Sequence, residues 1–271
     1  MGRVSRRWLV GILGLPIAAY VGLCAYLFVE QRQLVFQPNP APLDGPPAGS
    51  GLLALDVPVP GIGVLHDWWA PPASRAAPTI IFFHGNASTR ADFVAQAAFF
   101  QRRGWGVVLA SYPGFSGNPG HPTESTLMSA GRATIGAVAP RVGPIMLWGH
   151  SLGSGVAARM ASEGRAAGLV LESAYTSTTD VAAELYPYVP VRLLMLDRFD
   201  TRSLLPRIQI PVLIFHSTDD PVIPFAMGSE LAHRLGSRAT FVRMTGLGHN
   251  PHNQDLSNTV AAWAQRRHIG G

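Results

Sequence analysis

Hydrophobic and polar positions follow three different patterns along the 271 residues of this chain. Trp8 to Val29 contains no charged residue. Gln37 to Gly51 carries five prolines together with glycine and serine, a composition typical of an extended linker. From Leu52 onward, short apolar runs alternate with amphipathic stretches. Strands that alternate with helices predict an α/β domain built from βαβ units, with a mostly parallel sheet and helices on both sides.

The eight predicted strands are short and apolar, as strands buried on both faces of a sheet are. The first two are expected to form a hairpin through Pro60-Gly61. The predicted strands are Leu52–Val59, Val64–Trp69, Thr79–Phe83, Gly106–Ala110, Ile145–Trp148, Gly168–Leu171, Val212–Phe215 and Thr240–Met244. The predicted helices are Ala91–Arg103, Glu124–Val138, Leu152–Glu163, Phe225–Leu235 and Asp255–Arg267.

One long insertion, Ala174–Ile210, interrupts this alternation and contains the apolar stretch Val189–Leu196. It predicts a small cap over the carboxyl edge of the sheet, where open α/β sheets bind their ligands. The predicted organisation is therefore residues 1–30 as a membrane anchor, 31–51 as a Pro-rich linker and 52–271 as the α/β domain, with the cap at 174–210.

The apolar run near the N-terminus is long enough to cross a bilayer. Its 22 residues span about 33 Å as a helix, against about 30 Å for the hydrocarbon core. Arg3, Arg6 and Arg7 precede the run, and only Arg32 follows it closely. The positive-inside rule then predicts a cytoplasmic N-terminus and places the α/β domain on the non-cytoplasmic side.

The alternative is a signal peptide that is cleaved to give a secreted protein. Signal peptides have an apolar region of about 7–15 residues and a cleavage site with two small residues. The run here is longer, and its best candidate site, Gly22-Leu23-Cys24, matches poorly. A retained anchor is therefore favoured.

Composition excludes several classes of protein. Apolar residues make up 47% of the chain and charged residues 14%, which predicts a sizeable core and excludes global disorder. All 21 basic residues are arginine, and after position 7 they are scattered, so no basic patch indicates nucleic-acid binding. Gly114, Gly117 and Gly120 lack the spacing of a dinucleotide loop, and no metal-ligand motif is present. No cofactor or metal is predicted.

The strongest chemical signal is G-H-S-L-G at Gly149 to Gly153, directly after a predicted strand and before a predicted helix. This context is that of a nucleophile elbow, in which a strained turn exposes a serine hydroxyl at the edge of the sheet. Ser151 is therefore the predicted nucleophile. Gly149 and Gly153 are expected to leave room for the neighbouring strand and helix.

A serine hydroxyl needs a base to take its proton and an acid to orient that base. His249 follows the last predicted strand, between glycines in G-L-G-H-N, and is the predicted base, with His252 as the alternative. Asp220 follows the penultimate strand and is the predicted acid, with Asp219 as the alternative. The order Ser, Asp, His along the chain is that of α/β-hydrolases.

An oxyanion hole requires two backbone N–H groups. Leu152, the residue after the nucleophile, is expected to supply one. The loop His84-Gly85-Asn86-Ala87 follows the third predicted strand, and Asn86 is expected to supply the other. Tyr112, Phe115 and Tyr175 fall on loops near this region and are candidates for lining the substrate pocket, although packing in the core is the simpler interpretation.

Six motifs in order resemble the α/β-hydrolase superfamily and, within it, the serine-aminopeptidase-like group. They are F-F-H-G-N-A, S-Y-P-G-F-S-G-N-P-G, W-G-H-S-L-G-S-G, L-E-S-A-Y-T-S, F-H-S-T-D-D-P-V-I-P and G-L-G-H-N. The resemblance covers about Leu34 to Arg267 and is strongest to membrane-anchored members with a short cap, whose relatives include protein depalmitoylases. Ser217 and Pro251 depart from the group, where glycine and aspartate are usual.

This resemblance implies an α/β-hydrolase fold and the triad Ser151, Asp220 and His249, with Asn86 and Leu152 as oxyanion donors. It implies hydrolysis of an acyl ester or thioester, with a small-molecule or lipid-like acyl substrate and no cofactor. Two alternatives remain open at this point, a serine peptidase with the same triad and a catalytically silent binding protein with the same fold.

Overall fold

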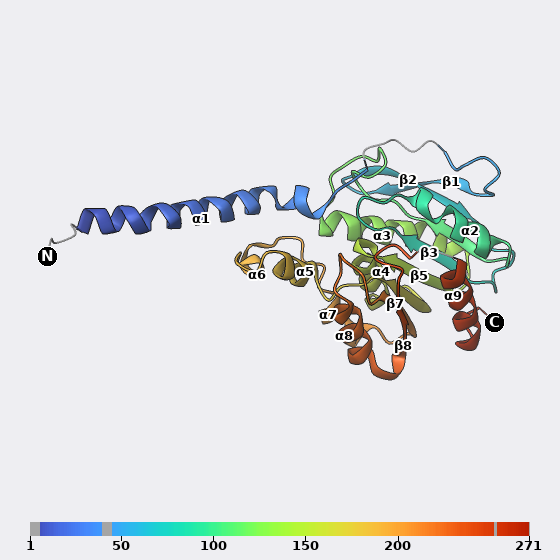
Figure 1. Cartoon of the computed structure of the whole chain (residues 1–271). Coiled ribbons are helices and arrows are strands. Elements are labelled where there is room, and N and C mark those ends of the chain that lie inside the picture. The colour runs from blue at the N-terminus through green and yellow to red at the C-terminus, as the bar shows by residue number, and fades with distance from the viewer. Residues whose placement is uncertain (1–5, 40–44, 252–253, 271) are drawn as a thin grey trace.

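The strands form one eight-stranded sheet in the order β1-β2-β4-β3-β5-β6-β7-β8, in a computed structural model that describes residues 6–39, 45–251 and 254–270 (Figure 1). From β4 to β8 neighbouring strands are parallel, whereas β1 and β2 are antiparallel additions at one edge. The strands are β1 Leu53–Val59, β2 Gly63–Ala70, β3 Thr79–Phe83, β4 Gly106–Leu109, β5 Ile145–His150, β6 Gly168–Glu172, β7 Val212–Ser217 and β8 Ala239–Met244.

Helices cover both faces of the sheet, and each face has its own apolar core. On one face lie α3 (Glu124–Val138), α4 (Leu152–Ser162) and α8 (Phe225–Leu235). On the other lie α2 (Val94–Gln101) and α9 (Gln254–Arg266). Because side chains alternate along a strand, β3 sends Ile81 and Phe83 to the first core and Ile80 and Phe82 to the second.

The hydrophobic pattern predicted these elements closely. β3, α3 and α8 have the predicted bounds, and the predicted hairpin is present, with β1 paired to β2. The largest difference in this domain lies before α2, where a 3₁₀ turn, Arg90–Phe93, opens the predicted helix. Thr89 caps this turn, so the backbone follows the local capping signal and not the apolar periodicity.

α1 runs from Arg6 to Val35 and so continues past the predicted end at Val29 into the predicted linker. Among the described residues, the one stretch long and apolar enough to cross a membrane is Gly14–Val35. No part of this stretch is buried inside the protein. Figure 1 shows α1 extending away from the sheet domain. Residues 1–5 and 40–44, which include Arg3, lie outside the described residues.

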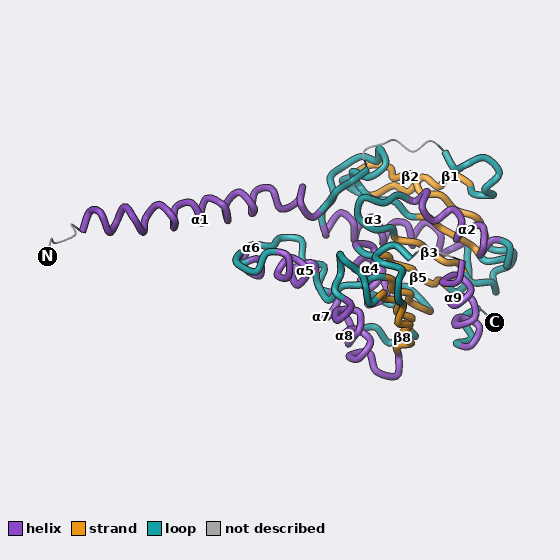
Figure 2. Tube along the Cα trace, in the orientation of Figure 1, coloured by secondary structure: helices purple, strands orange, loops and turns teal. Residues whose placement is uncertain are grey.

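The insertion after β6 folds into three short helices, α5 (Thr178–Leu185), α6 (Val191–Leu194) and α7 (Thr201–Leu204). α5 and α6, with the loop that joins them, project from the domain on the same side as α1 (Figure 2). Contacts between residues some 165 positions apart in sequence connect the two, such as that from Gln31 to Leu196. We call residues 174–210 the cap.

Candidate active site

Ser151 lies on a sharp turn between β5 and α4, with φ 48° and ψ −117°. This backbone conformation is strained for a residue with a side chain. The flanking glycines permit the close packing that holds it. A Cβ added at Gly153 would lie 2.0 Å from the carbonyl oxygen of Phe83, and one added at Gly149 would lie 2.4 Å from that of Gly153. The predicted elbow is therefore present.

The structure brings His249 and Asp220 to Ser151, although each lies on a different loop. His249 Nε2 is 3.0 Å from Ser151 Oγ. His249 Nδ1 is 2.9 Å from one oxygen of the Asp220 carboxylate and 3.0 Å from the other. Because β5, β7 and β8 are parallel, the loops that follow them meet at one edge of the sheet.

The Asp220 carboxylate is fully buried and well supplied with donors. Its Oδ1 accepts from the backbone N–H groups of Val222 and Ile223, each at 2.9 Å. Burial raises the pKa of Asp220, but hydrogen bonds from His216, His249 and these two N–H groups lower it by more. The pKa therefore lies well below its usual value, and the group beside His249 is a carboxylate ion.

Asp219, the alternative acid, points elsewhere. It accepts from Ser217 Oγ at 2.6 Å and from the backbone N–H groups of Gly246 and Gly248 at 2.8 and 3.2 Å. Asp219 thus fastens the loop that carries His249. Ser217, which replaces the usual glycine, takes part in this contact. His252, the alternative base, lies outside the described residues.

Ser173, to which the sequence assigned no role, and His150, expected from its place beside the nucleophile to be a packing or hydrogen-bonding residue, hold the backbone of the base. The carbonyl oxygen of His249 accepts from Ser173 Oγ at 2.9 Å, and His150 Nε2 lies 3.1 Å from it. Ser173 follows β6 and has φ 48°, so a second strained serine lies at this edge of the sheet. Ser173 lies in the motif L-E-S-A-Y-T-S, but the motif did not reveal its role, because that role depends on a residue 76 positions away.

The two predicted oxyanion donors flank the nucleophile. Leu152 begins α4, so its N–H group is among the first four of a helix, which have no intrahelical acceptor. On the other side, a Cβ added at Gly85 would lie 3.3 Å from Ser151 Cβ, so this loop passes against the elbow. The side chain of Asn86 faces away from the nucleophile and bonds to the end of α1.

Tyr112, Phe115 and Tyr175 are buried beneath these loops. The Tyr112 hydroxyl donates to the carbonyl of His84 at 3.1 Å, and that of Tyr175 donates to the carbonyl of Leu152 at 3.1 Å. Burial raises the pKa of both tyrosines, so both remain neutral donors. The three aromatics support the elbow and the His84-Gly85 loop from below, and a contact with substrate stays a prediction.

The remaining histidines near the site have structural partners. His84 is fully buried against Tyr112 and Phe115, and burial lowers its pKa to about 4. His216 Nε2 lies 3.0 Å from the carbonyl of Ile223. In the described part of the chain, no three His, Cys, Asp or Glu side chains are grouped so as to hold a metal ion.

Sequence comparisons agree with this architecture. A family model described as alpha/beta hydrolase fold matches residues 78–201, and one described as TAP-like protein matches residues 198–266. An uncharacterized protein of Mycobacterium tuberculosis is 32% identical over 251 residues, covering 87% of this chain and 88% of that protein. Lysophosphatidylserine lipase ABHD12 of Xenopus tropicalis is 30% identical over 212 residues, covering 70% of this chain and 55% of the lipase. The chain thus spans about half the length of that lipase.

Solved structures show the same fold. The esterase Pf2001 of Pyrococcus furiosus superposes with a TM-score of 0.71 at 16% identity, covering 87% of this chain and all of the esterase. Est1E from Butyrivibrio proteoclasticus, solved with ferulic acid, gives a TM-score of 0.67 at 18% identity, covering 79% of this chain and 99% of Est1E.

The sheet order and the elbow between β5 and α4 define a hydrolase with the α/β-hydrolase architecture. The sequence relatives extend this conclusion across most of the chain. The chain belongs to the α/β-hydrolase superfamily.

Proposed function

We propose that this protein is a membrane-anchored serine hydrolase that cleaves an acyl ester or thioester of a lipid-like substrate. One observation carries the proposal. Ser151 Oγ lies 3.0 Å from His249 Nε2, and the other ring nitrogen of His249 lies 2.9 Å from the buried carboxylate of Asp220. This arrangement supports a nucleophile, a general base and an orienting acid in these three roles.

In the acylation step, Ser151 Oγ attacks the acyl carbonyl carbon while its proton passes to His249 Nε2. The carbonyl oxygen becomes an oxyanion, which the N–H groups of Leu152 and Asn86 stabilise. The tetrahedral intermediate then expels the leaving oxygen or sulfur, which takes the proton from His249 and departs as an alcohol or thiol. Asp220 stabilises the imidazolium formed in between.

In the deacylation step, water gives a proton to His249 Nε2 and attacks the carbonyl carbon of the acyl-serine. The bond from Ser151 Oγ to that carbon breaks, and Ser151 recovers its proton from His249. The product is a carboxylic acid. Every proton moves through His249, so no cofactor is needed in this scheme.

Two features support a lipid-like substrate and a membrane location. Gly14–Val35 of α1 is long and apolar enough to cross a bilayer, and no part of this stretch is buried in the domain. The relative from Xenopus tropicalis is named a lysophosphatidylserine lipase. The arginines before the apolar run of α1 favour a cytoplasmic N-terminus, with the catalytic domain on the other side of the membrane.

Labelling with a fluorophosphonate probe tests the nucleophile. The purified full-length protein is expected to label at one serine, and Ser151→Ala is expected to abolish both the label and the hydrolysis of p-nitrophenyl esters. Ser154→Ala is the matched control, since Ser154 is a buried serine in α4, the helix that follows Ser151. Wild-type labelling no greater than that of Ser151→Ala would refute the proposal.

A second comparison separates an esterase from a peptidase with the same triad. We expect p-nitrophenyl acyl esters to be hydrolysed with a larger kcat/KM than aminoacyl p-nitroanilides. Faster turnover of the anilides by the wild type, lost in Ser151→Ala, would identify a peptidase instead.

A further inference from the structure

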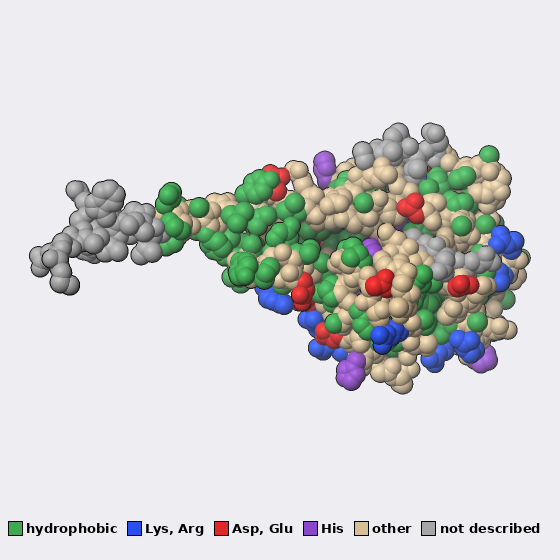
Figure 3. Space-filling view, in the orientation of Figure 1, with side chains coloured by type: hydrophobic (Ala, Val, Ile, Leu, Met, Phe, Trp, Pro, Cys, Tyr) green, Lys and Arg blue, Asp and Glu red, His purple; other side chains and the backbone are tan. Residues whose placement is uncertain are grey.

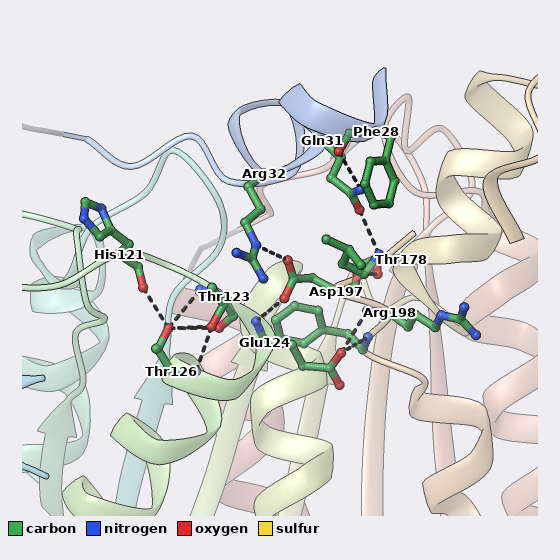
Figure 4. A network of polar contacts seen from close by, with 12 residues as sticks. Phe28, Gln31, Arg32, His121, Thr123, Glu124, Thr126, Thr178, Asp197 and Arg198 are labelled. Carbon is green, nitrogen blue, oxygen red and sulfur yellow. Dashed lines mark hydrogen bonds and ion pairs between the residues drawn. The ribbon is translucent and has the colours of Figure 1, made fainter. Parts of the chain in front are cut away.

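α1 is fastened to the cap along its C-terminal half. Arg32 Nε pairs with Asp197 Oδ2 at 3.0 Å, and Asp197 Oδ1 accepts from the N–H of Glu124 at 2.8 Å (Figure 4). Gln31 Nε2 donates to the carbonyl of Leu194 at 3.2 Å, and Gln31 Oε1 accepts from the N–H of Leu196 at 2.8 Å. These contacts fix the position of the cap relative to the helix.

A further contact lies three turns nearer the N-terminus of α1. The Tyr20 hydroxyl donates to the carbonyl of Tyr188 at 2.7 Å. Tyr20 is ten residues before Glu30, the first charged residue after the apolar run. Ten helical residues rise about 15 Å, and a typical tilt of about 20° shortens this by only about 1 Å.

This rise determines the depth of the cap, provided that α1 crosses the membrane as proposed above. If the hydrocarbon core begins near Glu30, a part of the cap that touches Tyr20 lies well inside it. The core is about 30 Å thick, so the tip of the cap reaches into the leaflet on the side of the catalytic domain. The tip consists of residues 185–191, between α5 and the start of α6.

The surface of the cap fits this position. Leu185, Tyr188 and Leu193 are 65%, 87% and 81% exposed, and residues 185–191 contain no charge. Isolated exposed apolar residues are common, but a group of them on one projection marks a contact surface. Figure 3 shows the apolar side chains of α1 and the cap side by side, with charged side chains nearer the domain.

Two charged residues flank the tip, Glu184 and Arg192. The guanidinium of Arg192 reaches back to Asp180, at the first turn of α5, at 2.9 Å. Both residues and Glu184 line a separate polar cavity. Because the Arg32–Asp197 pair lies at the base of the cap, α1 and the cap both change from apolar to charged at the same level, as a membrane boundary requires.

Most of the backbone of the tip is suited to an apolar environment, in which an unpaired N–H group is costly. Pro187 and Pro190 have no N–H group. The N–H groups of Tyr186, Val189 and Val191 donate within the cap, as do those of Leu193, Leu194 and Met195. The carbonyl of Tyr188 accepts from Tyr20.

An apolar groove lies between α1 and the cap. Its lining is apolar except for the Tyr186 hydroxyl and the amide of Gln31, and this amide is hydrogen-bonded to the cap backbone. At its inner end is Val35, whose carbonyl accepts from Asn86 on the loop beside Ser151. The groove is lined by Leu27, Phe28, Gln31, Leu34, Val35, Ala182, Tyr186, Val189, Val191, Leu194 and Met195.

We infer that the tip of the cap inserts into the bilayer beside α1 and that the groove between them binds the acyl chain of a membrane lipid. A chain in this groove stays in apolar surroundings from the bilayer to the oxyanion loop. This inference rests on the proposed membrane anchoring, and it names the bilayer as the source of the substrate.

Depth labelling tests the insertion without any use of activity. In the full-length protein with Cys24→Ser, which removes the sole native cysteine, a polarity-sensitive fluorophore is attached in the tip at Tyr188→Cys. The reference sites are Ile17→Cys on α1 and Leu53→Cys on β1, which are 63% and 55% exposed. Each protein is placed in phosphatidylcholine vesicles whose acyl chains carry a spin-label quencher.

The inference predicts that the label at Tyr188 is quenched as strongly as that at Ile17, whereas the label at Leu53 is not quenched. Quenching at Ile17 without quenching at Tyr188 would overturn the insertion and leave the anchoring intact. No quenching at Ile17 would overturn the anchoring itself, and the inference with it. A label at Tyr188 that is shielded from water but not quenched would indicate that protein covers the tip, which also overturns the inference.

Substitutions on α5 test the groove. Ala182 lines the groove, whereas the adjacent Ala183 lines the polar cavity. We expect Ala182→Trp to lower kcat/KM for p-nitrophenyl palmitate by about tenfold relative to p-nitrophenyl acetate, since a bulky side chain removes apolar surface from the acyl chain. Ala183→Trp is expected to leave this ratio unchanged. Equal effects of the two variants on the ratio would overturn the assignment of the groove.

Discussion

The side-chain amide of Asn86 donates to the backbone carbonyl of Val35, the last residue of α1, at 2.8 Å. The oxygen of the same amide accepts from the N–H of Gln37, also at 2.8 Å. The loop that we propose supplies an oxyanion donor is thus held by the segment that leaves the proposed membrane helix. The proposed anchor is therefore part of the scaffold of the proposed active site.

Asn86→Ala removes both contacts and keeps the backbone N–H group. We expect kcat for a soluble p-nitrophenyl ester to fall by about tenfold, less than the 10²–10³ lost when an oxyanion donor is removed outright. KM is expected to change little. Asn258→Ala, an exposed asparagine of α9, is the control and should match the wild type. Unchanged kcat in Asn86→Ala would show that the loop does not depend on this contact.

Substitutions of the adjacent aspartates Asp219 and Asp220 are expected to lower kcat by very different factors. Asp220→Asn should lower kcat by about 10³–10⁴, because the amide favours the wrong tautomer of His249. Asp219→Ala should lower kcat by only about 10-fold to 100-fold, through looser placement of the loop that carries the base. Steady-state kinetics of both variants on one ester measure the two losses. A larger loss of kcat in Asp219→Ala would show that Asp219, and not Asp220, is the acid that orients His249.

The close packing of the elbow predicts that a larger side chain at Gly153 destabilises the protein. Gly153→Ala places a methyl group against the Phe83 carbonyl, at a distance of 2.0 Å before relaxation. We expect the free energy of unfolding to fall by about 3 kcal/mol or more. Gly136→Ala in α3, where no atom lies within 4 Å of the added Cβ, should instead stabilise the protein by up to about 1 kcal/mol. Thermal unfolding of the two variants in the same detergent makes the comparison.

A buried carboxyl group in β2 predicts a pH dependence of stability. Asp67 is fully buried and accepts from the N–H of Ser111 at 2.8 Å and from Thr134 Oγ1 at 2.7 Å. Burial raises the pKa of Asp67 to about 6. Between pH 4 and 6 the folded protein therefore keeps a proton that the unfolded chain has released, so this group makes stability fall as pH rises through that range.

Asp67→Asn is expected to remove this contribution. At about 1.4 kcal/mol per pH unit, the effect amounts to about 3 kcal/mol between pH 4 and pH 7. Urea titrations at both pH values give the free energy of unfolding of variant and wild type. The difference between the two proteins should change by about 3 kcal/mol from pH 4 to pH 7. Asp255→Asn, an exposed aspartate in the first turn of α9, is the control. A difference for Asp67→Asn that is constant with pH would contradict the prediction.

The local sequence pattern was sufficient to predict the strands of the sheet, the helices packed on it and the order of the chemical motifs. The run Thr79–Phe83 has no polar alternation, so it had to be a strand buried on both faces, as β3 is. The spacing of Gly149, Ser151 and Gly153 predicted the elbow because the backbone constraint it meets is itself local. The end of α1 was not predicted. The prediction rested on the apolar run, which ends before the polar residues Glu30, Gln31 and Arg32, whereas the helix continues through them.

The sequence alone determined the strands, the helices that pack on the sheet, the elbow at Ser151 and a short set of candidates for acid and base. Tertiary structure alone decided that Asp220 faces His249 while Asp219 holds its loop, because neighbouring side chains of one turn point in different directions. It also decided that Tyr112 and Tyr175 support the site from below and that the cap lies along α1. Each of these depends on packing between distant segments, and a periodic pattern records only which faces are apolar.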